Sequence, residues 1–310
     1  MTTPDNRDAA IALGLKNATD IVSRRKVALA RRAQALSQRP GPRLLTATKQ
    51  QTAGQLVALG DSWFDYPFHD VIKELEDGHG FTIQSTAKAG DPIEAMAYHG
   101  GQLDNFARSL EKVKAQGASP KAVLLSGGGD DIAGKEFGML LNSAFSPISG
   151  WASGVVDYVI SERILLAYQT IVHTVTQLCQ QIAGVANIPV LVHGYDYPVP
   201  DGRGFLGGWL FLPGPWLEPG FKEKLFSDDQ LPQTTAMMQT IIKQFNTMLA
   251  GLAADQAFSN VRYINLLGTL SNNLKDSDYK NWWANELHPT EQGFAAVANK
   301  FATELNKLPN

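Results

Sequence analysis

Five short apolar segments constrain the fold of this chain most strongly. Each is rich in aliphatic or β-branched residues and runs into glycine, polar or turn-forming residues, as buried strands do. They span residues 55–59, 81–85, 122–126, 188–193 and 261–266. Helical periodicity separates them, and it predicts helices over 70–76, weakly over 93–116, over 164–182, over 238–252 and after Pro289. Alternating strands and helices with such long crossovers predict a parallel sheet covered by helices on both faces.

Length and charge predict one elaborated domain with a basic arm. The 310 residues carry a net charge of −3, yet eight basic residues and only one acid, Asp20, lie between Lys16 and Arg43. We therefore divide the chain into an N-terminal basic helical arm and linker, 1–50, and a body, 51–310, with insertions at about 137–158 and 195–230. The arm is interpreted as a helix on its own acidic body, a contact in a homo-oligomer, or a binder of anionic surfaces. Nucleic acid is not an expected partner, because further basic and stacking elements are missing.

Other motifs argue against membrane, metal and nucleotide chemistry. No uninterrupted apolar run reaches about 18 residues, and the first residues carry acids where a signal peptide has bases, so we expect a cytoplasmic protein. The only cysteine, Cys179, lies on an apolar helical stripe typical of a buried residue. The histidines lack metal-ligand spacing, and we expect no metal or cofactor. The segment GDDIAGK, 129–135, fits a phosphate-loop frame, but its two aspartates and Glu136 oppose that function.

Candidate site residues follow the predicted strands. In parallel sheets, ligands bind beyond the carboxyl ends of the strands. Ser62 follows the first segment within GDS, Gly90 follows the second within AKAGD, and Asp130 follows the third within SGGGDDIAG. His288 lies in NELHPTEQGF before the last predicted helix. A serine at such a position can also cap a helix, so the combination of motifs carries more weight than Ser62 alone.

These four motifs together resemble the SGNH (GDSL-type) hydrolase family of esterases and lipases, from residue 55 to the end of the sequence. The resemblance implies a three-layer α/β/α flavodoxin-like fold with a five-stranded parallel sheet. It also implies hydrolysis of a small-molecule ester without a cofactor. Ser62 would be the nucleophile and His288 the general base. The backbone amides of Ser62 and Gly90 and the side chain at position 130 would form the oxyanion hole.

Two departures from the family pattern fall on the chemistry. Asp130 stands where the family has asparagine, and Asn285 stands where the family usually has aspartate. A carboxylate repels an oxyanion unless it is protonated, and an amide orients an imidazole without balancing its charge. Three interpretations stay open: a Ser–His dyad, an auxiliary acid such as Glu286, Asp131 or Asp130 itself, or a catalytically weak lipid- or carbohydrate-binding protein.

A long irregular segment, 195–221, is too apolar for a plain surface loop. Glycine and proline interrupt regular structure there, while aromatic residues recur. We expect it to form a lid over Ser62, with 137–158 as a second wall, although packing or a dimer contact would need the same composition. The predicted substrate-binding residues are Asp61, Trp63, Tyr195, Trp209 and Phe211.

Overall fold

The computed structural model describes residues 4–37, 52–99, 101–134, 136–207 and 212–309. A five-stranded sheet in the order β2-β1-β3-β6-β7 forms its centre, and every neighbouring pair is parallel. The strands are β1 (Gln55–Leu59), β2 (Thr82–Ser85), β3 (Ala122–Leu125), β6 (Val190–His193) and β7 (Val261–Ile264). Each lies within the segment predicted for it, so all five strand predictions are confirmed.

Burial explains why these runs form strands. Every residue of β1, β3 and β6 is buried, as expected for central parallel strands with both faces covered. The register pairs Leu59 with Leu125, and Leu125 with Val192. The carboxyl ends of these three strands therefore reach the same edge of the sheet, and the loops that follow them emerge together.

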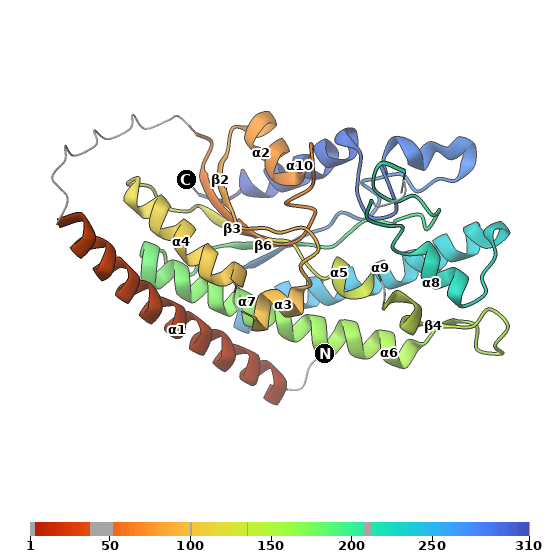
Figure 1. Cartoon of the computed structure of the whole chain (residues 1–310), viewed down its shortest axis with the longest axis horizontal. Coiled ribbons are helices and arrows are strands. Elements are labelled where there is room, and N and C mark those ends of the chain that lie inside the picture. Colours follow the sequence, from red (N-terminus) through yellow and green to blue (C-terminus); the bar gives the residue numbers. More distant parts are fainter. Residues whose placement is uncertain (1–3, 38–51, 100, 135, 208–211, 310) are drawn as a thin grey trace.

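Helices cover both faces of the sheet (Figure 1). One face is covered by α2 (Val71–His79) and α10 (Glu291–Leu305), and the other by α4 (Gly101–Ala115), α7 (Leu165–Leu178) and α9 (Leu231–Ala254). The predicted three-layer α/β/α flavodoxin-like fold is confirmed, because the strand order is that of the flavodoxin-like class. The weak helical pattern over 93–116 corresponds to two helices, α3 (Ile93–Tyr98) and α4.

The basic arm contains one long helix, α1 (Pro4–Ser37), which lies outside α4 and α7 as an additional layer (Figure 1). Ala18, Ile21 and Val22 are buried in the common core, and both guanidinium bonds of Arg25 to Glu111 are short, at 2.8 and 2.6 Å. This geometry matches the interpretation of the arm as a helix on its own acidic body. The linker, 38–50, lies outside the described residues, and the boundary at residue 50 stays a prediction.

The two insertions pack against each other beside the sheet edge. The first contains an antiparallel pair, β4 (Leu141–Asn142) and β5 (Gly150–Trp151), followed by α6 (Ser153–Tyr158). The second contains α8 (Glu218–Glu223). The rings of Phe137 and Phe221 join them with centroids 5.1 Å apart. In the part of the chain that the structure describes, no helix has the length and apolarity needed to cross a bilayer.

Candidate active site

Ser62 and His288, 226 residues apart in the sequence, meet beyond the carboxyl end of β1. The loop after β1 approaches β3 so closely that a Cβ at Gly60 would lie 2.7 Å from the Cβ of Ser126. The Gln102 side chain holds this loop, because it accepts from the Gly60 N–H at 3.0 Å and donates to the Gly60 carbonyl at 2.9 Å. His288 precedes α10, and its Nε2 lies 2.7 Å from Ser62 Oγ. This is the reach that a base needs to take the hydroxyl proton.

Asn285 fixes the orientation and the tautomer of the imidazole. Its Oδ1 accepts from the backbone N–H groups of Leu287 and His288, at 3.0 and 2.9 Å, so this atom must be the oxygen of the amide. The same Oδ1 lies 3.0 Å from His288 Nδ1. An oxygen without a proton can only accept, so Nδ1 carries the ring proton and Nε2 is free to accept from Ser62.

Aromatic rings enclose the imidazole. Tyr66 stacks on His288 with centroids 4.1 Å apart and planes inclined by 15°, and Trp216 presents an edge contact at 5.5 Å. The Asn285 amide donates to the Tyr66 hydroxyl at 2.9 Å. Burial lowers the pKa of His288 to about 3 and raises the pKa of Tyr66 to about 12. The imidazole is therefore a neutral base near neutral pH. Forming its cation is costly, because among the described residues its ring nitrogens bond only to Asn285 and Ser62 and to no carboxylate.

The three groups predicted to form an oxyanion hole line one cavity with His288. In the described part of the chain, the backbone N–H groups of Ser62 and Gly90 have no hydrogen-bond acceptor. Gly90 has φ = 80°, a left-handed conformation that favours glycine and aims this turn at the site. Asp130 stands in the first turn of the short helix α5 (Gly129–Ile132) and lines the same cavity as Ser62, Gly90 and His288.

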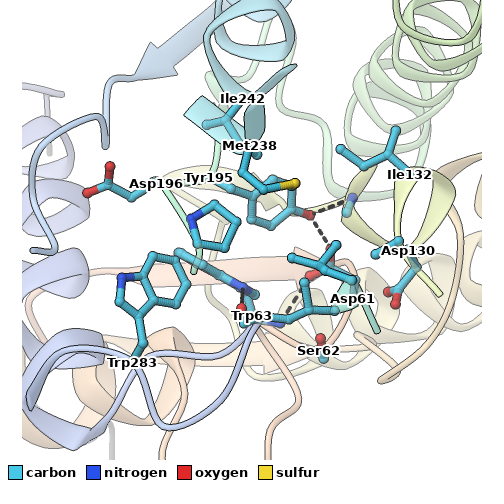
Figure 2. A pocket seen from close by; sticks show the side chains of 15 residues that line it. Asp61, Ser62, Trp63, Asp130, Ile132, Tyr195, Asp196, Met238, Ile242 and Trp283 are labelled. Carbon is cyan, nitrogen blue, oxygen red and sulfur yellow. Dashed lines mark hydrogen bonds between the residues drawn. The ribbon is translucent and has the colours of Figure 1, made fainter. Parts of the chain in front are cut away.

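Two cavities meet at Ser62. The larger has a volume of 310 Å³ and is mostly apolar; the lid segment contributes Phe205, Leu212, Pro213 and Trp216 to its wall. The smaller, drawn in Figure 2, has a volume of 40 Å³ and lies deeper. Trp63, Tyr195, Met238, Ile242 and Trp283 are among its lining residues. Of the predicted substrate-binding residues, Trp63 and Tyr195 thus line a cavity beside Ser62, while Trp209 and Phe211 lie outside the described residues.

Asp61 ties the serine loop to two other strand ends. Its Oδ1 accepts from Ser126 Oγ at 2.6 Å and from the Trp63 N–H at 3.0 Å. Its Oδ2 accepts from the Tyr195 hydroxyl, which in turn accepts from the Gly129 N–H at 3.1 Å. Asp61 borders the small cavity, but both of its carboxylate oxygens are occupied. It therefore holds the loops before Ser62 and Asp130 in place, and substrate binding by Asp61 stays a prediction.

A second Ser–His pair lies beneath this network and is sealed from solvent. His193 Nε2 is 2.8 Å from Ser126 Oγ, and both residues are fully buried. Its Nδ1 donates to the Gly194 carbonyl at 2.8 Å. Although His193 is the last residue of β6, its ring packs against Trp63 and Phe64 and has no exposed surface.

The predicted auxiliary acids do not contact the imidazole. Glu286 accepts instead from the backbone N–H groups of the lid residues Gly202, Trp216, Leu217 and Glu218, at 2.6 to 3.0 Å. Asp131 accepts from the N–H groups of Ile93 and Glu94 at the start of α3. Both ring nitrogens of His288 have other partners, Asn285 and Ser62. The interpretation of a neighbouring acid as partner of His288 is therefore wrong for Glu286 and Asp131. For Asp130, which lines the same cavity as His288, it stays a prediction.

Comparisons with known proteins give distant structural similarity. No protein-family model matches the chain, and no curated protein matches its sequence. An acetylxylan esterase from Geobacillus stearothermophilus is similar over 83% of this chain and 96% of its own, with 14% identity and a TM-score of 0.40. A candidate SGNH hydrolase from Slackia heliotrinireducens is similar over 81% and 98%, with 12% identity and a TM-score of 0.40. An alpha/beta hydrolase enzyme from the metagenome of Lake Arreo, Spain, is similar over 84% and 98%, with 11% identity and a TM-score of 0.40.

Sequence reasoning missed three residues that contact the site or the serine loop. Gln102 is the second residue of α4, and its polar side chain is buried against the loop after β1. Ser126 ends the predicted third strand, and only its polarity after four apolar residues marks it. Trp216 lies in the irregular lid segment, where no periodicity shows which aromatic ring faces His288.

Proposed function

We propose that this chain is a serine hydrolase that cleaves carboxylic esters through an acyl-enzyme on Ser62, with His288 as the general base. The observation that carries the proposal is the 2.7 Å contact between His288 Nε2 and Ser62 Oγ, with Nδ1 held by Asn285. A serine hydroxyl is a weak nucleophile at neutral pH until a positioned base accepts its proton. The resemblance of the four sequence motifs to SGNH hydrolases supports the same reaction.

The proposed reaction uses His288 twice. Nε2 takes the hydroxyl proton while Ser62 Oγ bonds to the ester carbonyl carbon, and the carbonyl oxygen becomes an oxyanion facing the N–H groups of Ser62 and Gly90. When the C–O bond to the alcohol breaks, the imidazolium returns the proton to the leaving alkoxide. Water then enters, loses a proton to Nε2 and attacks the acyl carbon, which releases the acid and restores Ser62.

The surroundings favour esters with an apolar portion. Aromatic and aliphatic lid residues line the 310 Å³ cavity beside Ser62 and His288. Because Asn285 cannot balance the imidazolium charge, the pair is better matched to an ester than to the less electrophilic carbonyl of an amide. These points also fit a catalytically weak lipid- or carbohydrate-binding protein, the second candidate.

A fluorophosphonate probe with site mapping by mass spectrometry tests the proposal. We expect covalent labelling on Ser62, its loss in Ser62→Ala and a large reduction in His288→Ala, together with hydrolysis of p-nitrophenyl esters. Ser126 is an internal control, because its own histidine partner is sealed from the probe. A wild-type protein that resists the probe and cleaves neither acetate nor octanoate esters would favour the binding protein.

A further inference from the structure

Asp130 occupies the edge of the proposed oxyanion site. It lines the larger cavity together with Ser62, Gly90 and His288, and it also borders the smaller cavity. In Figure 2 its carboxyl group lies on the same side of the small cavity as Ser62. The backbone places it there, because α5 begins directly after the glycine-rich loop at the end of β3. Asp130 is therefore positioned to touch a substrate oxygen bound next to Ser62.

The carboxyl group of Asp130 lacks the compensation that its acidic neighbours have. Its Oδ2 is shielded from solvent and has no hydrogen-bond partner among the described residues. Asp61 accepts three hydrogen bonds, Asp131 accepts two backbone N–H bonds, and Asp91 is paired with Lys88 and bonded to Gln102. A buried polar atom with no partner is costly unless a ligand or a proton satisfies it.

The charges facing Asp130 are mostly negative. Asp131 acts on it from the next position of α5, and Asp61 and Asp91 act on it from two other loops. Arg163 lines a cavity together with Asp130, but its guanidinium group is paired with Glu94. No set of three His, Cys, Asp or Glu side chains within the described ranges is arranged to hold a metal ion. Burial, followed by the charges of these three aspartates, raises the pKa of Asp130 to about 8.

We propose that Asp130 carries a proton during catalysis and donates it as a hydrogen bond to the oxyanion, as the third donor beside the N–H groups of Ser62 and Gly90. This inference rests on the ester hydrolysis proposed above. A neutral carboxyl group has one O–H donor, whereas an ionised one has only acceptors. Carboxylic acids kept neutral by an apolar site can fill such a donor role in enzymes. At position 130 the chain thus has a carboxyl group, whose donor is lost on ionisation, where the family has the asparagine amide, which is a donor at every pH.

The direction of the pH dependence follows. Below the raised pKa, Asp130 is a donor; above it, the carboxylate repels the oxyanion and kcat/KM falls by up to tenfold per pH unit. His288, Asp131 and Tyr195 have pKa values away from that of Asp130. The pKa of His288 is lowered to about 3, burial together with two N–H donors leaves the pKa of Asp131 at about 6, and burial raises that of Tyr195 well above its ordinary value. An alkaline loss of activity therefore reports Asp130.

The test compares pH–rate profiles of wild type and Asp130→Asn on p-nitrophenyl acetate between pH 5 and 10. Asparagine keeps the shape and supplies a donor at every pH, so the alkaline fall should disappear while activity at pH 6 stays within about tenfold of wild type. Asp157→Asn, the same exchange at an exposed site on α6, should leave the profile unchanged. Asp91→Asn removes one nearby charge and should move the alkaline midpoint to lower pH.

Infrared difference spectra provide a readout independent of turnover. In a Ser62→Ala background, the carboxylic-acid C=O band at pH 6 should exceed that of the same background with Asp130→Asn, and this difference should be gone at pH 10. An identical alkaline fall in wild type and Asp130→Asn, or equal carboxylic-acid bands in the two backgrounds at pH 6, overturns the inference even if Ser62 is labelled by fluorophosphonate. If neither protein is labelled or hydrolyses ester, the proposed function itself fails.

Discussion

At the scale of single residues, the site fixes the orientation of His288 but does not balance the charge of its protonated form. Asn285 gathers three N–H donors on one oxygen and thereby holds His288 in the tautomer that can accept from Ser62. The amide cannot stabilise the imidazolium that forms during each turnover. The geometry of a triad is therefore present, but its charge compensation is missing.

Replacing Asn285 by aspartate should restore that compensation. One oxygen of the new carboxylate can accept the same three hydrogen bonds. Its second oxygen would accept a hydrogen bond from the Tyr66 hydroxyl. A carboxylate beside His288 raises its pKa. We expect kcat on an acetate ester to rise roughly tenfold to a thousandfold, and the acidic limb of the pH–rate profile to move to higher pH.

Asn281→Asp introduces the same charge at an exposed position nearby and should change neither quantity. Unchanged turnover in Asn285→Asp would mean that the imidazolium charge does not limit the reaction.

The meeting of Ser62 and His288 was expected from the resemblance of their motifs to SGNH hydrolases. Strand ends converge in a parallel sheet, which places Ser62 but not His288, because His288 lies just before α10. The wrong predictions concern side chains whose partners are backbone groups. Glu286 lies next to Asn285 in sequence, and only the conformation of the lid shows that its carboxylate points away from the imidazole. Likewise, a histidine at a strand end such as His193 can face the crevice or the core, and the conformation of the backbone that follows the strand decides which.

At the scale of elements, the lid segment is held by one buried side chain. Glu286 accepts from four backbone N–H groups of that segment, and it lies two residues before His288. Hydrogen bonds from neutral donors to a buried charge are among the stronger ones in proteins. They partly offset burial, which still raises the pKa of Glu286 above its ordinary value.

We expect Glu286→Gln to weaken both the lid and the site. Glutamine would present an NH2 group to backbone donors, leaving part of the set without an acceptor. The loss should be about 3 kcal/mol in unfolding free energy by urea titration, with reduced ester turnover because Trp216 and His288 lose their common anchor. Glu291→Gln, an exposed exchange on α10, is the matched control. Equal stability of the two variants would contradict this assignment.

The regular elements were predictable because hydrophobic periodicity is local, whereas the insertions were not. Strands buried on both faces appear in sequence as continuous apolar runs, and each of the five lies inside its run. The lid segment, 195–221, has little periodicity, and its path depends on contacts such as Phe221 with Phe137 in the other insertion. Its position as a cavity wall could be expected from composition, but the residues facing His288 could not.

At the scale of the whole molecule, α1 adds a layer to the three-layer body. Small residues allow it to lie close to α7: a Cβ at Gly14 would lie 2.8 Å from the Thr170 carbonyl oxygen and 2.9 Å from the Cβ of His173. Ion pairs of Arg24 with Asp104 and of Arg25 with Glu111 add contacts to α4. Basic side chains of the arm thus form ion pairs with acidic side chains of the same chain.

Gly14→Leu should separate α1 from α7 and cost roughly 1–3 kcal/mol of unfolding free energy, as overpacking does. The helix lies against the face of α7, away from the serine loop, so fluorophosphonate labelling of Ser62 at low temperature should keep its wild-type rate. Ala12→Leu places the same side chain at an exposed position of α1 and should leave the thermal midpoint unchanged. A wild-type midpoint in Gly14→Leu would show that α1 does not depend on this close contact.

The link through Glu286 also limits how this protein can diversify. Any insertion or deletion that shifts the backbone amides around Trp216 is transmitted, through one carboxylate, to a histidine two positions along the chain. New substrate preferences must then arise by exchanging side chains on a lid of constant length, or by replacing the lid segment together with the loop 285–289.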